Sequence, residues 1–176
     1  MNERTRVVVG IDGSAESQAA LRFALEEAAL RGTGVRIVSV LLPPPYWPEA
    51  YGLSAPPTVE ERKADLRRVA RRLFDAAVAG RPGLAAVPVE PHEVQGRPAE
   101  VLVEQSRDAD LLVVGHRGRG GFASAMLGSV GLQCVLHAQC PVTVVRPAVR
   151  EPVAEPEAAV RGVRARVAET LFTPIY

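Results

Sequence analysis

The sequence predicts an α/β fold, in which helices cover both faces of a mostly parallel β-sheet. Runs of β-branched residues alternate with helical patterns, and strands joined by helices pack as right-handed, parallel units. The run at residues 111–114 is apolar without alternation, which is typical of a strand buried on both faces. A chain of 176 residues with 47% hydrophobic residues fills one core, so we expect one domain plus a tail.

The chain opens with a strand and a helix. Residues 6–11 are expected to form the first buried strand, and Ser14 can cap a helix that passes through Ala29. Gly32 and Gly34 are expected to end this helix, because glycine adopts conformations that other residues avoid.

A second strand is expected at residues 35–42, followed by a long loop. Three consecutive prolines end the strand, because proline cannot donate to a sheet ladder. The loop at residues 43–57 carries the aromatic residues Tyr46, Trp47 and Tyr51. It can be a lid over a ligand or a flap packed on the surface, and both interpretations stay open.

The rest of the domain continues the alternation of helices and strands. A second helix is expected to begin at Thr58, with arginines on its solvated face. A third strand at residues 87–94 contains Pro88 and Pro91, which favours an edge position. The remaining expected elements are a helix at 97–107, a strand at 110–114, a helix from Gly128 to about Ala138 and a strand at 141–146.

Beyond Pro147 the composition changes. Residues 149–156 are rich in Pro, Glu and Val and resemble a linker. Residues 157–171 place four apolar residues on one helical face, namely Val160, Val163, Val167 and Leu171. This segment can pack on its own subunit, pack on a second subunit or remain a weakly ordered end, and the pattern does not choose among the three.

Charge and composition exclude several classes of partner. The formal net charge of +1 provides no field that would attract nucleic acid or an anionic membrane. No apolar stretch is long enough to span a bilayer, and the N-terminus has no signal-peptide pattern, so we expect a cytoplasmic protein. Lys63 is the only lysine and lies in a helical segment, which excludes a P-loop and a protein-kinase site.

A glycine motif follows the fourth expected strand. It consists of Gly115, His116, Arg117 and Gly118 and, after nine intervening residues, Gly128 and Ser129. Glycines let the backbone approach a ligand, and a helix that starts at Ser129 offers unpaired N–H groups to an anion. The motif therefore predicts an anion cradle that needs no cationic side chain.

The loops after the first and fourth strands predict one ligand crevice. Ligands of parallel α/β sheets bind beyond the carboxyl ends of the strands, where the strand order reverses. Asp12, Gly13 and Ser14 follow the first strand, and the glycine motif follows the fourth. If the two strands are neighbours, both loops line the same crevice.

These residues resemble the universal stress proteins, and the resemblance covers about residues 5–146. Nucleotide-binding members of the family carry the signature G-x2-G-x9-G-S/T. The signature is matched, with no change of spacing, by Gly115, Gly118, Gly128 and Ser129. Residues 7–14 resemble the family's first strand and loop, and residues 128–142 resemble its closing segment.

The resemblance implies a three-layer, Rossmann-like fold of the adenine nucleotide alpha hydrolase type. Its five parallel strands would have the order 3-2-1-4-5, which places the first and fourth strands side by side. The chain would divide into a universal stress protein domain at 1–146 and a C-terminal extension at 147–176. Antiparallel pairing of the last strand, Val142 to Val145, would hide an apolar edge and make a homodimer.

The resemblance also implies an adenine nucleotide site. Asp12 would contact the ribose or adenine end, and Val40 would form a wall for the adenine. The phosphate path would be lined by Gly115, Gly118, Gly128, Ser129 and Val130. Cation candidates for the outer phosphates are His116, Arg117 and Arg119. The ligand would be ATP, with ADP, AMP and cyclic AMP as alternatives, and Mg²⁺ can accompany the phosphates.

We therefore expect a stress-response regulator that acts as a dimeric, nucleotide-dependent switch on an unidentified protein partner. A slow ATPase or autophosphorylating protein that uses Ser129 is one alternative, and a nucleotide-free interaction module is another. No general base or pair of magnesium carboxylates accompanies the glycines, so we expect no enzyme and no catalytic residues.

Simpler structural interpretations exist for several of these residues. Asp12 can hold the start of the first helix, and the glycines can serve turn geometry alone. The RGG-like run at 117–122 is one short copy, which argues against RNA binding. Cys134, His137 and Cys140 have a zinc-like spacing, but no fourth ligand is evident, so we expect reduced, buried thiols and no metal.

Overall fold

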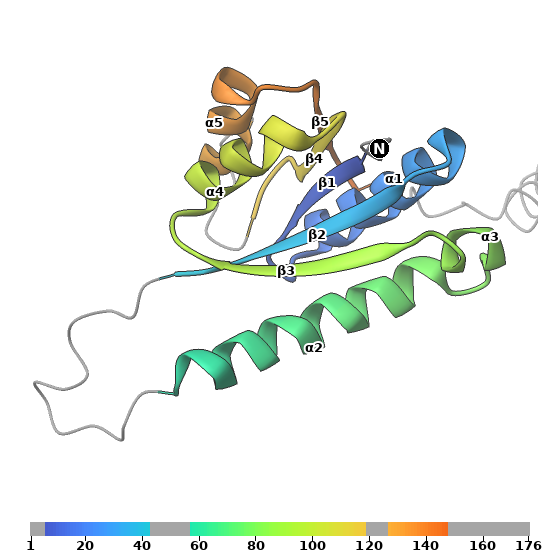
Figure 1. Cartoon of the computed structure of the whole chain (residues 1–176), viewed down its shortest axis with the longest axis horizontal. Coiled ribbons are helices and arrows are strands. Elements are labelled where there is room, and N and C mark those ends of the chain that lie inside the picture. Colours follow the sequence, from blue (N-terminus) through green and yellow to red (C-terminus); the bar gives the residue numbers. More distant parts are fainter. Residues whose placement is uncertain (1–5, 43–56, 119–126, 148–176) are drawn as a thin grey trace, which may run out of the picture.

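Five parallel strands form the centre of the protein (Figure 1). The computed structural model describes residues 6–42, 57–118 and 127–147. The strands are β1 (Arg6–Ile11), β2 (Gly34–Leu41), β3 (Val89–Gln95), β4 (Leu111–Gly115) and β5 (Val142–Val145). They pair in parallel in the order β3-β2-β1-β4-β5, which confirms the order implied by the family resemblance.

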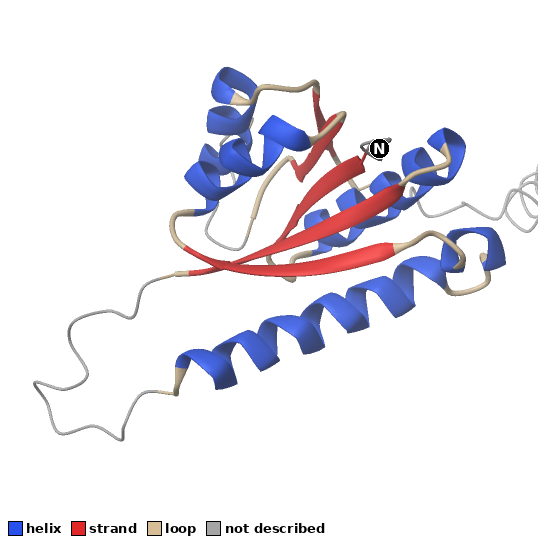
Figure 2. Ribbon diagram, viewed as in Figure 1, coloured by secondary structure: helices blue, strands red, loops and turns tan. Residues whose placement is uncertain are grey.

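Helices cover the sheet on both faces (Figure 2). They are α1 (Ala15–Arg31), α2 (Val59–Val78), α3 (Pro82–Ala85), α4 (Pro98–Gln105), the 3-10 turn η2 (Ser106–Asp108) and α5 (Ser129–His137). The short helix α3 was not expected, because four residues are too few to show a helical period. The third expected helix was placed at 97–107, and its last turn is the tighter 3-10 form.

Alternating side chains of the strands build two separate cores. Val7 and Val9 of β1 face the cluster that contains residues of α1, α2 and α3. Val8 faces the opposite cluster, which contains Leu102 of α4 and Cys134 of α5. Burying such side chains stabilises the fold by about 1.5–3 kcal/mol each. The three-layer α/β class predicted from the sequence is therefore confirmed.

Local capping sets the bounds of α1. The Ser14 hydroxyl accepts a hydrogen bond from the Ser17 N–H at 3.2 Å, so Ser14 caps the helix as expected. Gly32 ends it with a φ of 65°, which is a left-handed conformation that favours glycine. The helix therefore begins immediately after the loop at residues 12–14, and that loop is held at the carboxyl end of β1.

The third strand begins later than the sequence pattern indicates. It was expected at 87–94, but β3 is Val89–Gln95, because the Val87 N–H donates to the Leu84 carbonyl in the turn after α3. The strand lies at the edge of the sheet, as Pro88 and Pro91 predicted.

Some predictions concern residues outside the described ranges. These are the aromatic residues of the 43–57 loop, Arg119 with the rest of the RGG-like run, and the tail after Pro147. Among the helices of the described ranges, none has the length and apolar character needed to cross a membrane.

Candidate functional site

The two loops singled out in the sequence lie at the same edge of the sheet. Strands β1 and β4 are neighbours, with Val7 opposite Leu111 and Val9 opposite Val113. Because the strands are parallel, the loops that follow them meet at the shared carboxyl end. We call residues 12–14, 115–118 and 128–130 the carboxyl-end site.

Asp12 organises the first loop of this site. Its Oδ1 accepts hydrogen bonds from the Ser14 backbone N–H at 3.0 Å and from the Ser14 hydroxyl at 2.6 Å. Gly13, between them, has a φ of 85°, a conformation that other residues rarely adopt. The structural role considered for Asp12, holding the start of the first helix, is therefore present.

Gly118 approaches the other oxygen of the same carboxylate. A Cβ added to Gly118 would lie 2.6 Å from Asp12 Oδ2, which is closer than real side-chain contacts. The absence of a side chain at Gly118 thus lets the loop after β4 come up to the loop after β1. Both loops are exposed at this point, since Asp12 and Gly118 are both exposed residues.

Gly115 is required by packing rather than by a ligand. A Cβ at Gly115 would lie 2.9 Å from Glu16 Cβ and 3.0 Å from the Glu16 carbonyl carbon. The last residue of β4 therefore packs directly on the first turn of α1. This contact sets the distance between the two loops.

His116 joins the glycine motif to its neighbours through the backbone. Its N–H donates to the Val145 carbonyl at 2.9 Å, and its carbonyl accepts from the Gly128 N–H at 2.8 Å. The Nδ1 atom of the ring is buried and has no hydrogen-bond partner within the described part of the chain. A buried unsatisfied nitrogen marks a place where a bound group can complete the hydrogen bonding.

Helix α5 presents an uncapped N-terminus to this site. Gly128 is its N-cap residue and provides no side-chain hydrogen bond to the first turn. The first N–H groups of the helix therefore keep their capacity to bind an anion. Ser129 is exposed, and Val130 is half-buried against the core on the α4 and α5 side.

Val40 lies at the carboxyl end of β2, beside the site. It is half-buried against the core on the α4 and α5 side, one residue beyond the pair formed by Ile11 and Ser39. Arg117 is half-buried, and Arg119 lies outside the described residues. The fold therefore brings together Asp12, Val40, His116 and the four signature residues at one edge of the sheet.

Ser17 belongs to this site and was not singled out from the sequence. Its hydroxyl accepts from the Gly13 N–H at 3.2 Å and donates to the Ser14 carbonyl at 2.9 Å, and the residue is 3% exposed. The spacing of Asp12, Ser14 and Ser17 carries this signal, since it places each hydroxyl within reach of the turn.

The two cysteines are free thiols, as expected. Cys134 is fully buried, and burial raises the pKa of its thiol to about 11, whereas Cys140 is only half-buried. Within the ranges 6–42, 57–118 and 127–147, no three His, Cys, Asp or Glu side chains are placed to hold a metal ion.

A doubly wound sheet of parallel strands, with the uncapped N-terminus of α5 beside the loops that follow β1 and β4, places the protein in the class of Rossmann-like α/β proteins. Within that class, residues 3–146 match the universal stress protein family. The chain belongs to this family.

Curated relatives of this chain occur in mycobacteria. Universal stress protein Rv2624c of Mycobacterium tuberculosis is 34% identical over 149 residues, which cover 85% of this chain and 51% of that protein. A universal stress protein of Mycolicibacterium smegmatis is 35% identical over 148 residues, with 83% and 47% covered. The chain thus spans about half the length of the curated relatives it matches.

Solved structures share the fold. A universal stress protein in complex with cAMP is 29% identical, with a TM-score of 0.59 over 81% of this chain and 97% of that chain. The universal stress protein of Archaeoglobus fulgidus in complex with dAMP is 26% identical, with a TM-score of 0.52 over 80% and 96%.

Proposed function

We propose that this protein binds an adenine nucleotide, with ATP as its ligand in the cell, at the carboxyl-end site. The observation that carries the proposal is the close approach of Gly118 to Asp12 beside the uncapped N-terminus of α5. Two family members of the same fold were solved with cAMP and dAMP, which supports an adenine nucleotide as the class of ligand.

The residues of the site suit the parts of such a nucleotide. The Asp12 carboxylate can accept hydrogen bonds from ribose hydroxyls, and Val40 offers an apolar surface for the adenine. The phosphates fit the backbone N–H groups of the signature residues, namely Gly115, Gly118, Gly128, Ser129 and Val130. Nδ1 of His116 and the guanidinium groups of Arg117 and Arg119 are proposed for the outer phosphates, and a Mg²⁺ ion can accompany them.

We expect binding without efficient turnover. One oxygen of Asp12 already accepts two hydrogen bonds from Ser14, which suits a positioning role rather than a general base. A micromolar dissociation constant needs only about 8 kcal/mol, which backbone amides and adenine burial can supply. Incubation of purified protein with ATP should yield no product above a no-protein control. Steady ADP release would instead favour the slow ATPase.

We further propose that the protein is a homodimer in a reducing compartment such as the cytoplasm, and that nucleotide occupancy controls binding of a partner protein. β5 is an edge strand whose four residues are half-buried, so a second copy can pair with it. The His116–Val145 hydrogen bond connects this edge to the carboxyl-end site. Sedimentation equilibrium should give twice the mass of one chain, and a monomer at micromolar concentration would contradict the dimer.

The first test identifies the small molecule that co-purifies with the protein. Denaturing mass spectrometry should find an adenine nucleotide with the wild type and none with Gly118→Asp, whose carboxylate would lie beside Asp12 and repel phosphate. Gly83→Asp is the matched control, because a Cβ at Gly83 meets nothing within 4 Å. A wild type that is empty and fails to bind added ATP, ADP and cAMP would refute the proposal.

A further inference from the structure

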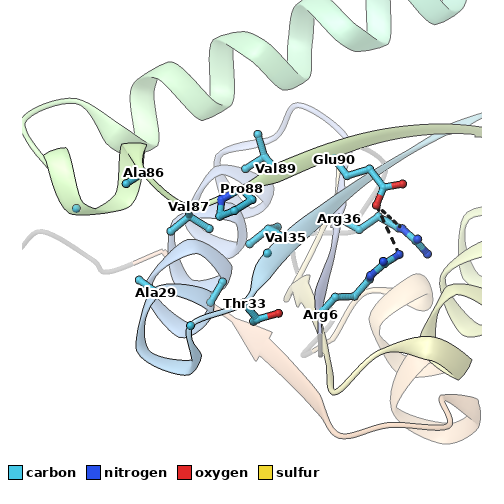
Figure 3. Close-up of a pocket in the computed structure, with 14 residues that line it drawn as sticks. Arg6, Ala29, Thr33, Val35, Arg36, Ala86, Val87, Pro88, Val89 and Glu90 are labelled. Atoms are coloured by element: carbon cyan, nitrogen blue, oxygen red, sulfur yellow. Dashed lines mark hydrogen bonds and ion pairs between the residues drawn. The ribbon is translucent and has the colours of Figure 1, made fainter. Parts of the chain in front are cut away.

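A depression lies at the opposite edge of the sheet, at the amino ends of β1, β2 and β3. Figure 3 shows it between the end of α1, the turn after α3 and the first residues of these strands. Its volume is about 910 Å³, and it is open to solvent. None of its lining residues belongs to the carboxyl-end site. We call it the amino-end pocket.

Two arginines share one carboxylate in this pocket. Arg6 Nη1 lies 3.5 Å and Arg36 Nε lies 3.4 Å from the same Glu90 oxygen, Oε2 (Figure 3). Strand register explains the arrangement, because Arg36 pairs directly with Glu90 and Arg6 pairs with Gly34. Both contacts are longer than the 2.7–2.9 Å of a strong charge-assisted hydrogen bond. A single oxygen therefore serves two guanidinium groups poorly.

Arg36 is held in place from its other side. Its Nη1 donates to Gln105 Oε1 of α4 at 2.9 Å, and its side chain is only 16% exposed. A fixed guanidinium loses less conformational entropy when it binds an anion than a free one does. Arg36 thus provides a preorganised half of a binding site, with Arg6 on the neighbouring strand as the other half.

Thr33 adds an unsatisfied hydroxyl. It lines the pocket immediately before Gly34, the register partner of Arg6, and is 8% exposed. Its Oγ1 is buried and has no hydrogen-bond partner within the described ranges. In Figure 3 this hydroxyl points to the side on which Arg6 lies. Unpaired buried hydroxyls are uncommon in native proteins, because burial without a partner costs free energy.

The remaining lining is mainly aliphatic. The exposed apolar lining consists of Pro88, Ala86 and Ala29, whereas Val35 and Val87 belong to the buried core on the α1 and α2 side. Arg6, Arg36 and Glu90 together give the described lining a net charge of +1. One excess positive charge beside an apolar surface suits a monoanion with a hydrocarbon part better than a phosphate dianion or a cation.

From this arrangement we infer that the amino-end pocket binds a small organic carboxylate with an apolar body. The carboxylate would lie between Arg6 and Arg36, complete their hydrogen bonding and accept from the Thr33 hydroxyl after a local rearrangement. The hydrocarbon part would cross the amino edge of the sheet and lie against the exposed side chains of Pro88, Ala86 and Ala29. This binding is independent of the nucleotide proposal, because it uses the other edge of the sheet.

Hexanoate is the probe, and isothermal titration calorimetry on the full chain is the measurement. We expect saturable 1:1 binding to the wild type, at least tenfold weaker binding to Arg6→Gln, and a smaller loss in Thr33→Val. 1-Hexanol, which lacks the charge, and inorganic phosphate, which lacks the apolar body, should each bind at least tenfold more weakly than hexanoate. Arg71→Gln removes an arginine that pairs with Asp75 on exposed α2 and should leave binding unchanged.

Two further variants guard against ambiguous results. Gly118→Asp should bind hexanoate like the wild type, whereas a loss of binding there would move the carboxylate to the carboxyl-end site and overturn the inference. Arg6→Lys keeps the charge without the planar guanidinium, and intermediate affinity is expected if Arg6→Gln does not fold. The inference fails if hexanoate does not saturate the wild type, or if a folded Arg6 variant binds hexanoate as tightly as the wild type does.

Discussion

Asp12 Oδ2 lies 2.6 Å from the position that a Cβ on Gly118 would occupy, so the carboxylate of one loop fills the space left by the missing side chain of another. The two residues are more than a hundred positions apart in the chain and meet because β1 and β4 are adjacent. Five predictions test this contact and other features of the fold.

The first prediction concerns the coupling between Gly118 and Asp12. Gly118→Ala should lower ATP affinity about tenfold, because the new methyl group displaces the Asp12 carboxylate. The melting temperature should change little, since the clash involves only the exposed end of a flexible side chain. Calorimetric titration of Gly118→Ala, Asp12→Ala and the double variant measures the coupling. Losses that simply add would show that the contact has no role in binding.

The second prediction concerns packing between β1 and α4. A Cβ on Gly10 would lie 2.8 Å from Leu102 Cδ1, and Leu102 is buried. Gly10→Ala should therefore lower the free energy of unfolding by about 1–3 kcal/mol through overpacking. Leu102→Val shortens the opposing side chain, so the double variant should lose less than the sum of the single changes in urea unfolding. Strict additivity would show that the two side chains do not compete for space.

The third prediction concerns the start of α2. Thr58 Oγ1 accepts from the Glu61 N–H at 3.2 Å, and Glu61 Oε2 accepts from the Thr58 N–H at 2.7 Å, which together form a capping box. Thr58→Ala should cost about 1 kcal/mol in the free energy of unfolding, measured by urea denaturation. Thr58→Ser keeps the hydroxyl and should restore most of the loss. Equal losses in both variants would mean that the methyl group matters and the cap does not.

The fourth prediction concerns thiol reactivity and its pH dependence. Burial raises the pKa of Cys134 to about 11, so about one molecule in a thousand carries the thiolate there at pH 8. Iodoacetamide should alkylate half-buried Cys140 first, and the Cys140→Ser variant should react only slowly below pH 10. Addition of urea should abolish the protection, because unfolding returns the pKa to its ordinary value of 9.0. Rapid labelling of folded Cys140→Ser at pH 8 would contradict the burial of Cys134.

The raised pKa of Cys134 also predicts how stability depends on pH. The unfolded chain releases this proton at a lower pH than the folded protein does. The contribution of the buried thiol is therefore fully present below pH 9 and decreases as the pH rises towards 11. A comparison of wild type with Cys134→Ala in urea at pH 8 and pH 10.5 separates this contribution from other groups.

The order of elements follows from the sequence because strong local signals mark each one. The apolar run at 111–114 and the Ser14 cap left little ambiguity about β4 and α1. The boundary of β3 was wrong by two residues because Val87 is apolar and buried, yet belongs to a turn. The apolar residue at position 87 therefore reflects burial in the core and not pairing in the sheet.

The carboxyl-end site was predictable where it depends on spacing along the chain. The glycine motif and Asp12 can be recognised in the amino-acid sequence, and the parallel topology of the sheet brings them together. The unsatisfied Nδ1 of His116 and the amino-end pocket were not predictable. They depend on which residues face each other across strands, and that register is determined by the whole sheet.

The backbone of His116 makes hydrogen bonds to two different elements, β5 and the start of α5. Its N–H holds the end of β5, and its carbonyl holds the residue that begins α5. A shift of β5 along its axis would therefore reposition the first turn of α5 through the backbone of one residue, with no side chain in between. Both hydrogen bonds use backbone atoms only, so substitutions that preserve the fold keep them. The exception is proline at position 116 or 128, which lacks the N–H donor that each bond needs.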